Sequence, residues 1–281
     1  MRLPDLRTLP RAVVIVLLLA WTLGPIYVGV VTSISTRTSI SDVPPQWYPS
    51  PVSLDGYASL LPGAKGQGTS GQFFDAFFNS MVLAGSATFL TLVLSVLSGY
   101  AFARLRFGGR RTFMVLVIGT IAIPLFLLIV PLFRIMSGLR LVGTFPGIIT
   151  LYVVAYTPLG IWLFYNYVRD LPIELEEAAR VDGCTRFQAF LRIVIPEMRP
   201  GIAALTAILF LATWGEFTIP LIFASNEQTQ PLTVIITQFV GKYTLDIPLM
   251  MAAGVISMLP PAIVALVLSR HIREMITGWG G

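Results

Sequence analysis

The chain has 281 residues, of which 55% are hydrophobic and only 12% are charged, and its mean hydropathy is +0.80. A water-soluble domain keeps about a quarter of its residues charged, so this composition excludes an ordinary soluble protein and indicates a polytopic membrane protein. The formal net charge of +5 comes mostly from arginines that flank apolar runs, which makes membrane topology a better explanation than nucleic-acid binding.

Six apolar runs with few or no charges follow one another along the chain. Each has about 20 residues or more, enough for a helix that rises 1.5 Å per residue to cross a hydrocarbon core of about 30 Å. Helices are expected because an isolated strand could not satisfy its backbone polar groups in lipid. The predicted spans are 12–32, 76–103, 112–133, 145–168, 201–224 and 248–269. The sequence therefore predicts an all-α membrane protein with six transmembrane helices.

The first run follows three arginines, as the apolar core of a secretory signal peptide would. It is longer than such a core and lacks an Ala-x-Ala cleavage site. We therefore expect a short N-terminal segment over 1–11 and a retained first helix over 12–32. The following loop, 33–75, is rich in Pro, Gly and Ser, which favours an irregular connector over a folded domain.

The positions of the basic residues predict the orientation in the membrane. With the N-terminus in the cytoplasm, fourteen of the nineteen Lys and Arg residues fall in cytoplasmic segments and five fall outside. The inverse topology would reverse this ratio and violate the positive-inside rule. We expect both termini, the loop 169–200 and the tail 270–281 to be cytoplasmic, and the loop 33–75 to be extracytoplasmic.

The cytoplasmic stretch 174–201 carries nine charged side chains between two apolar runs. Three acidic residues open it, as suits the first turn of a helix. Gly183 is expected to end a first short helix, and Pro196 with Pro200-Gly201 to end a second. Apolar residues recur mostly every three or four positions, at Val181, Cys184, Phe187, Phe190, Leu191 and Val194. Because acidic residues suit an anionic leaflet poorly, a docking surface for another protein is favoured over a membrane anchor.

Glu216 is the one ionisable residue well inside a predicted span. An intramembrane acid is costly and usually faces a polar cavity or a partner. Its aromatic neighbours could stack on a sugar ring, and Gly215 and Pro220 could open the helix locally. Pairing with a partner subunit, or reaching the outer interface, would explain the acid equally well. The candidate substrate-path residues are Trp214, Glu216, Phe217, Asn79 with its neighbour Ser80, Tyr152 and Tyr156.

The sequence lacks the motifs that ATP hydrolysis and membrane-bound hydrolases require. The two lysines, Lys65 and Lys242, lie outside any G-x-x-x-x-G-K-[ST] phosphate loop, and neither H-E-x-x-H nor G-x-S-x-G occurs. We expect no catalytic residues, no ATP hydrolysis and no cofactor in this chain. The single Cys184 excludes an internal disulfide and disfavours a metal site. The lone His271, beside Arg270, is expected to face solvent or lipid headgroups.

The cytoplasmic stretch carries a specific resemblance. Glu177-Ala178-Ala179, three residues, Gly183, nine residues and Ile193-Val194-Ile195-Pro196 resemble the EAA loop, E-A-A-x3-G-x9-I-x-L-P. That loop belongs to the membrane subunits of ATP-binding-cassette (ABC) importers. Ile195 replaces the more common Leu, and Cys184 replaces a small Ala.

Other segments resemble carbohydrate permeases of the maltose-importer type. The segment 213–217 is similar to W-N-[DE]-F, with Gly215 in place of Asn, whereas 32–37 and the loop after it match poorly. The remaining similar segments are Asn79-Ser80, Tyr100-Ala-Phe-Ala-Arg104, Phe107-Gly-Gly-Arg110, Pro131-Leu-Phe133 and Pro200-Gly201.

The resemblance implies a type I ABC importer permease fold with a five-helix core over 76–269, in the bacterial cytoplasmic membrane. The EAA loop would form a coupling helix that fits a groove on the ATPase. Small alanines permit close approach, carboxylates offer charge-assisted hydrogen bonds, and a glycine permits a sharp turn. The ATPase-coupling residues would be Glu177, Ala178, Ala179, Asp182 and Gly183.

The implied partners are a second permease subunit, two ATPase subunits that bind ATP and Mg, an extracytoplasmic solute-binding protein, a mono- or oligosaccharide, and membrane lipid, with no nucleic acid. Glycerol-phosphate diesters or polyols are the main rival substrates. A proton-coupled transporter with Glu216 as its proton site is an alternative, and a non-transporting scaffold is another. Both leave the EAA stretch unexplained.

Overall fold

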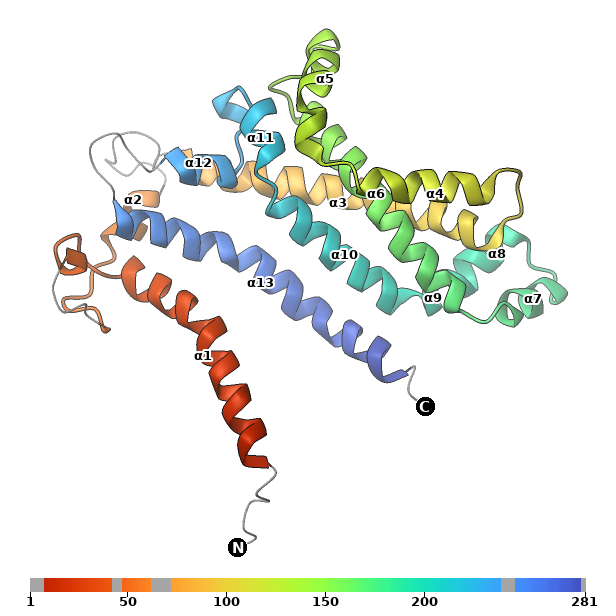
Figure 1. Cartoon of the computed structure of the whole chain (residues 1–281), viewed down its shortest axis with the longest axis horizontal. Helices are drawn as coiled ribbons and strands as arrows, with labels where there is room; N and C mark the ends of the chain where they lie inside the picture. The colour runs from red at the N-terminus through yellow and green to blue at the C-terminus, as the bar shows by residue number, and fades with distance from the viewer. Residues whose placement is uncertain (1–7, 42–46, 62–71, 239–245, 279–281) are drawn as a thin grey trace, which may run out of the picture. The chain divides into compact units, whose positions relative to one another are not determined.

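The computed structural model describes residues 8–41, 47–61, 72–238 and 246–278 (Figure 1). Helices dominate the described part of the chain, and none of its residues forms a strand. The predicted all-α class is confirmed. The first seven residues, Lys65 and Lys242, to which the topology prediction also refers, lie outside the described ranges, as do the side chains of Arg270 and His271.

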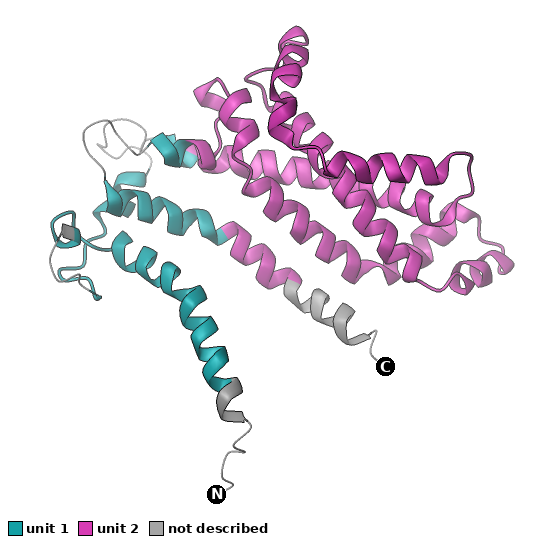
Figure 2. Ribbon diagram, viewed as in Figure 1, with its two compact units in different colours: residues 1–74, 235–259 teal, residues 75–234, 260–281 magenta. Residues whose placement is uncertain are grey.

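The chain divides into two compact units, which we describe separately (Figure 2). Unit 1 comprises Met1–Phe74 and Ile235–Leu259, and unit 2 comprises Asp75–Val234 and Pro260–Gly281.

Unit 1 contains a long apolar helix with a loop attached to its end. Its elements are α1 (Thr8–Ser33), the 3-10 turn η1 (Ser39–Ser41), α2 (Asp55–Leu60), the last residues of α12 (Leu232–Gln238) and the first part of α13 (Ile247–Gly278). The loop returns to α1 because the N–H of Ser53 donates to the carbonyl of Ile34 at 2.9 Å, and the hydroxyls of Ser33 and Tyr57 lie 2.8 Å apart. The predicted irregular connector thus contains a short helix.

Unit 2 contains the remaining helices, arranged around two buried apolar clusters. One cluster packs α6 against α3 and α11 around Tyr152, and the other packs α6 against α10 and the η3 turn around Phe164. The elements are α3 (Phe73–Arg104), α4 (Arg110–Ile121), α5 (Leu125–Gly138), α6 (Phe145–Asp170), α7 (Glu174–Val181), α8 (Arg186–Ala189), the π-helical turn η3 (Phe190–Val194), α9 (Ile195–Glu197), α10 (Arg199–Trp214), α11 (Thr218–Phe223) and the 3-10 turn η4 (Glu227–Thr229).

Four helices in the described residues are long and apolar enough to span a membrane, and they coincide with four of the predicted spans. These helices are Ala12–Ser33, Phe73–Arg104, Phe145–Asp170 and Ile247–Leu268. Two bent helix pairs would raise the number of spans to six if each pair crosses the membrane once.

The prediction of a single helix over 112–133 is wrong. The chain bends by 95° between α4 and α5, at Ala122–Pro124. Pro124 has no N–H to continue the helix, and its ring disfavours helical dihedrals at the residue before it.

The predicted span 201–224 is also broken. Helix α10 ends at Trp214 and α11 begins at Thr218, so the local opening expected near Gly215 is present. At its other end α10 is joined to the run 186–197 with a bend of 74°. As expected, this run ends close to Pro196. The helical geometry is lost two residues later, at Met198.

The backbones of α3 and α6 approach each other closely at Gly160. A Cβ atom at this position would lie 2.1 Å from Oγ of Ser95 and 2.9 Å from its Cβ. Farther along α3, the hydroxyls of Thr88 and Thr213 lie 3.2 Å apart and connect α3 to α10. Small residues and hydroxyl contacts of this kind are typical of helix packing in membranes.

Candidate functional site

Helix α7 has the charge distribution of a stable short helix. Its first turn carries Glu174, Glu176 and Glu177, and its last turn carries Arg180. Acids near the N-terminus and a base near the C-terminus interact favourably with the helix dipole.

Gly183 ends α7, as predicted, in a left-handed conformation with φ of +90°. The N–H of Gly183 donates to the carbonyl of Arg180 at 3.1 Å, and the N–H of Cys184 donates to the carbonyl of Ala179 at 3.0 Å. This pair of bonds is the Schellman motif, which satisfies the last carbonyls of a helix. A Cβ at Gly183 would meet nothing within 4 Å, so the turn requires glycine for its conformation and not for space.

The next helix begins with a capping box that our sequence interpretation missed. The side chain of Thr185 accepts from the N–H of Gln188 at 3.2 Å, and the Gln188 side chain accepts from the N–H of Thr185 at 2.8 Å. The signal is Thr-x-x-Gln directly after the turn. The hydrogen bonds at the end of α7 and at the start of α8 therefore fix the turn between these two helices.

Most of the predicted coupling residues lie at the surface. Glu177, Ala178, Asp182 and Gly183 are exposed, whereas Ala179 is buried. The predicted apolar stripe divides in the same way. Phe190 and Val194 are buried, Cys184 is partly buried, and Leu191, Phe187 and Val181 are exposed by 48%, 64% and 87%. Carboxylates and large apolar side chains are therefore both exposed along 177–191, where no other part of the described chain covers them.

Glu176 points the other way and was not singled out by our interpretation of the sequence. Its carboxylate accepts from Nε of Arg104 at 2.5 Å and from the hydroxyl of Tyr100 at 2.9 Å. Arg104 also donates to the carbonyl of Leu171 at 2.6 Å. No local signal separates Glu176 from Glu177, because Arg104, the partner of Glu176, lies 72 positions earlier in the chain.

Among the candidate path residues, Glu216 and Tyr156 are brought together. Oε2 of Glu216 accepts from the hydroxyl of Tyr156 at 2.6 Å. Oε1 accepts from the N–H groups of Thr218 and Ile219 at 2.9 and 3.2 Å, so this carboxylate also caps α11. Tyr152 is buried next to Tyr156, with ring centroids 6.5 Å apart.

The remaining candidates make different contacts. Trp214 is buried, stacks on Phe210 with centroids 5.6 Å apart and meets Phe77 edge-on. Phe217 is exposed by 38%. The side-chain amide of Asn79 donates to two backbone carbonyls of the segment between α11 and α12. This segment follows the break between α10 and α11 in the chain. All six residues belong to unit 2.

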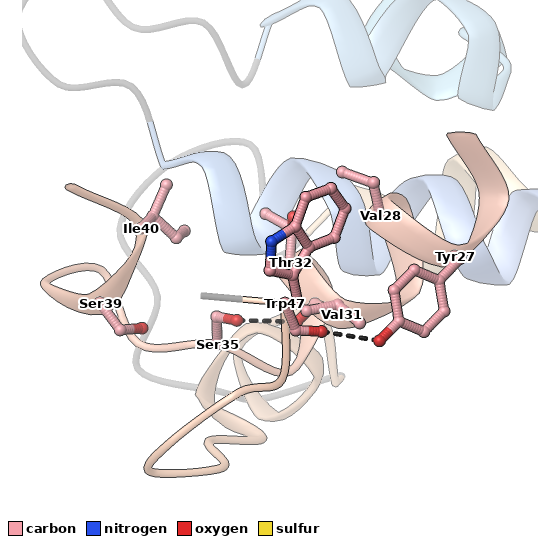
Figure 3. Close-up of a pocket in the computed structure, with 8 residues that line it drawn as sticks. All are labelled: Tyr27, Val28, Val31, Thr32, Ser35, Ser39, Ile40 and Trp47. Atoms are coloured by element: carbon pink, nitrogen blue, oxygen red, sulfur yellow. Dashed lines mark hydrogen bonds between the residues drawn. The ribbon is translucent and has the colours of Figure 1, made fainter. Parts of the chain in front are cut away.

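Two cavities in the described part of the chain lie in unit 1. The first has a volume of about 270 Å³, and Figure 3 shows Tyr27 and Trp47 among its lining residues, with the Tyr27 hydroxyl bonded to the Trp47 carbonyl. The second, of about 410 Å³, is lined by hydroxyls and by the ion pair of Arg37 with Asp246. No predicted path residue lines either cavity.

An all-helical membrane chain with broken spans, and with a short capped helix that presents its acidic and apolar face outward, has the architecture of a transporter's membrane subunit. Residues 92–277 match the family described as binding-protein-dependent transport system inner membrane component, and the chain belongs to this family.

Curated relatives cover most of the chain. It is 32% identical over 250 residues to the sulfoquinovosyl glycerol transport system permease protein SmoH of Agrobacterium fabrum, a match that covers 89% of this chain and 85% of the relative. It is also 32% identical to the arabinooligosaccharides transport system permease protein AraQ of Bacillus subtilis, over 83% of this chain and 80% of the relative. The diacetylchitobiose uptake system permease protein NgcG of Streptomyces coelicolor is 32% identical, over 72% of this chain and 67% of the relative.

Solved structures share the fold. A chain of a bacterial ABC transporter involved in the import of the acidic polysaccharide alginate superposes with a TM-score of 0.80 at 21% identity, covering 97% of this chain and 100% of that one. A chain of the MetNI methionine ABC transporter in an inward-facing conformation gives a TM-score of 0.60 at 19% identity, over 72% and 95% of the two chains. The expected importer permease fold is confirmed.

Proposed function

We propose that this chain is one of two permease subunits of an ATP-driven importer for a mono- or oligosaccharide. A second permease completes the translocation path, a solute-binding protein delivers the sugar from outside, and two ATPase subunits bind ATP and Mg in the cytoplasm. The family description supports the binding protein. The printed names of the relatives, which include arabinooligosaccharides and diacetylchitobiose, support a sugar.

The observation that carries the proposal is the outward surface of α7 and the turn after it. Glu177 and Asp182 offer exposed carboxylates, and Val181 and Phe187 expose large apolar side chains on the same short stretch. A surface of this kind suits a protein groove that contains both basic and apolar groups, where charge-assisted hydrogen bonds fix the orientation. The Schellman motif at Gly183 keeps the two halves of this surface together.

In the proposed arrangement the chain crosses the bacterial cytoplasmic membrane six times, with both termini inside. The four long spans and the two bent pairs support this number. The excess of arginine in the predicted cytoplasmic segments supports the orientation.

The proposed sugar path lies beside the break between α10 and α11, where Glu216 and Phe217 stand in non-helical backbone. Broken helices place backbone and polar side chains where a solute can meet them, which is tolerated in membranes only where the break faces protein or a cavity. Tyr156 holds the carboxylate in place.

A second candidate keeps the same assembly and changes the solute. One relative is named as the osmoprotective compounds uptake permease protein GgtD of Synechocystis, and it is 32% identical over 73% of this chain and 69% of its own length. Polyols or glycerol-phosphate diesters are therefore the alternative substrate class.

The test is uptake into proteoliposomes that contain this chain, its partner permease and the ATPase, with the binding protein outside. A panel of labelled arabino-oligosaccharides, chito-oligosaccharides and polyols is offered with internal ATP. The proposal expects saccharide uptake that vanadate abolishes and a protonophore leaves unchanged. Uptake driven by a proton gradient without ATP would refute it, and uptake of polyols alone would select the second candidate.

A further inference from the structure

A buried ion pair connects α7 with the end of α3. The side chains of Arg104 and Glu176 are exposed by only 10% and 9%. Tyr100 bonds the same carboxylate, and Arg104 bonds the carbonyl of Leu171, the residue that ends α6. Three helix ends therefore meet at one polar contact. Glu176, the acid in this contact, directly precedes Glu177, whose exposed carboxylate belongs to the proposed docking surface on α7 and the turn after it.

This contact fixes the position of α7 relative to α3 more than it adds to the stability of the fold. A buried ion pair gives up the hydration of both charges, so apolar side chains of equal size would hold two helices together equally well. Apolar surfaces can slide over one another, whereas bonds at 2.5 and 2.9 Å to the two oxygens of one carboxylate fix its position. The ring of Tyr100 also packs on Phe190, with centroids 4.5 Å apart, which holds the hydroxyl in place.

At its other end α3 holds the segment that leads into α12. Nδ2 of Asn79 donates to the carbonyls of Gln228 and Gln230, each at 3.0 Å, and Oγ of Ser80 accepts from the N–H of Leu232 at 2.8 Å. All of these side-chain groups are buried or partly buried, so water competes little for the bonds.

The two attachments belong to one uninterrupted helix. Asn79 and Arg104 both lie in α3, which contains no proline, and the 25 intervening steps correspond to roughly 37 Å at 1.5 Å per residue. The segment held at the far end also reaches the candidate path, because the hydroxyl of Thr233 donates to the backbone carbonyl of Glu216 at 3.0 Å. If α7 moved and α3 moved with it as one body, the backbone next to Glu216 would thus move as well.

We propose that Glu176 and Arg104 are positioning residues of transport and make α3 a strut. Glu177 and Asp182 dock the ATPase, Glu176 passes the movement to Arg104, and Asn79 passes it to the segment 226–233. The inference rests on the proposed coupling function, since without an ATPase at α7 there would be no movement to pass on.

The test reports on the far end of the strut in the complete importer. Gln228 is exposed, so a cysteine placed there in a Cys184→Ser background can be labelled by a membrane-impermeant maleimide. The labelling rate is compared before and after trapping the complex with ATP and vanadate. ATPase copurification and ATP hydrolysis are measured on the same preparations.

Three variants separate transmission from folding. Arg104→Met with Glu176→Leu removes both charges, so no unpaired charge is left buried, and only the Tyr100 hydroxyl and the Leu171 carbonyl lose a hydrogen bond. Tyr100→Phe removes a single bond to the carboxylate and keeps the ring on Phe190. Glu174→Gln, which changes an exposed acid on the same helix, is the matched control.

In the parent, trapping should change the labelling rate at position 228. The double variant should keep ATPase copurification and hydrolysis, but its change in labelling rate on trapping should be about tenfold smaller than that of the parent. Tyr100→Phe should show a smaller reduction of the same change. The reason is that a hydrogen bond to a charged group contributes roughly a factor of ten in an equilibrium constant. Glu174→Gln should behave as the parent.

A parent with no change at position 228, or variants that respond as the parent does, would overturn the strut. If the double variant fails to assemble, Tyr100→Phe decides, and a full response in it overturns the inference. A parent chain with which no ATPase copurifies contradicts the proposed function instead.

Discussion

Replacing Gly183 by valine tests whether the turn after α7 aims the docking surface. The backbone there has φ of +90°, a region that β-branched residues avoid, while a new side chain would meet nothing within 4 Å. The cost is therefore conformational, about 1–3 kcal/mol. At the middle of that range, 2 kcal/mol, the fraction of chains that leave the native turn rises roughly 30-fold. Those chains lose the Schellman bonds to Ala179 and Arg180 and misdirect Asp182.

The assay compares Gly183→Val with Gly183→Asn in the assembled importer. Asparagine adopts left-handed conformations at much lower cost than valine, so it serves as the matched control. We expect the valine variant to insert normally but to lose at least tenfold in ATPase copurification and in transport-linked hydrolysis, and the asparagine variant to stay within about threefold of the parent. Equal activity of valine and glycine would refute the reasoning, because it would show that the turn does not set the geometry.

Four further substitutions test other parts of the proposal. Glu177→Lys reverses an exposed charge at the docking surface and should abolish ATPase copurification without affecting insertion, which a pull-down measures; normal copurification would argue against docking here. Glu216→Gln keeps the size of the side chain and should lower uptake with little loss of assembly, whereas Trp214→Ala should also lower the melting temperature, because emptying a buried Trp site costs about 3–5 kcal/mol; uptake at the parent's rate in Glu216→Gln would assign the acid to capping alone. Gly160→Ala should destabilise the purified chain by about 1–3 kcal/mol through contact with Ser95, and Ser95→Gly should restore it; an unchanged melting temperature in the single variant would show that α3 and α6 can separate at no cost.

The fold class followed from the sequence because lipid leaves the backbone few options. Any run long enough to cross must be helical, and four of the predicted runs are single helices. The bend at Ala122–Pro124 was not predicted, since apolar composition continues through it, whereas Gly215 and Pro220 indicated the opening between α10 and α11. A proline or glycine permits a break, but the packing of neighbouring helices decides whether the helix only kinks or ends.

The candidate site was predictable where the cause is local. Gly183 and its turn depend on a few consecutive residues, and the structure has them as expected. Glu176 and Glu177 are equivalent in composition and differ only in which way they face. That difference depends on Arg104, which is 72 positions away in the sequence, and no local pattern can identify such a partner.

The π-helical turn η3 has a consequence for how this loop can change length. A π turn holds one residue more than the α-helical turn it replaces, and Phe190–Val194 form such a turn between α8 and α9. Removing one residue there would restore regular α-helical winding and leave the flanking residues pointing much as they do now, because the π turn already holds the extra residue. Inserting a residue into α8 would instead rotate everything upstream by about 100° about the helix axis, since an α-helix has 3.6 residues per turn. Val181 and Phe187 would then swing away from the direction in which they now point. Functional descendants of this chain should therefore lack single-residue insertions between Gly183 and Phe190, whereas the loss of one residue within Phe190–Val194 should be tolerated.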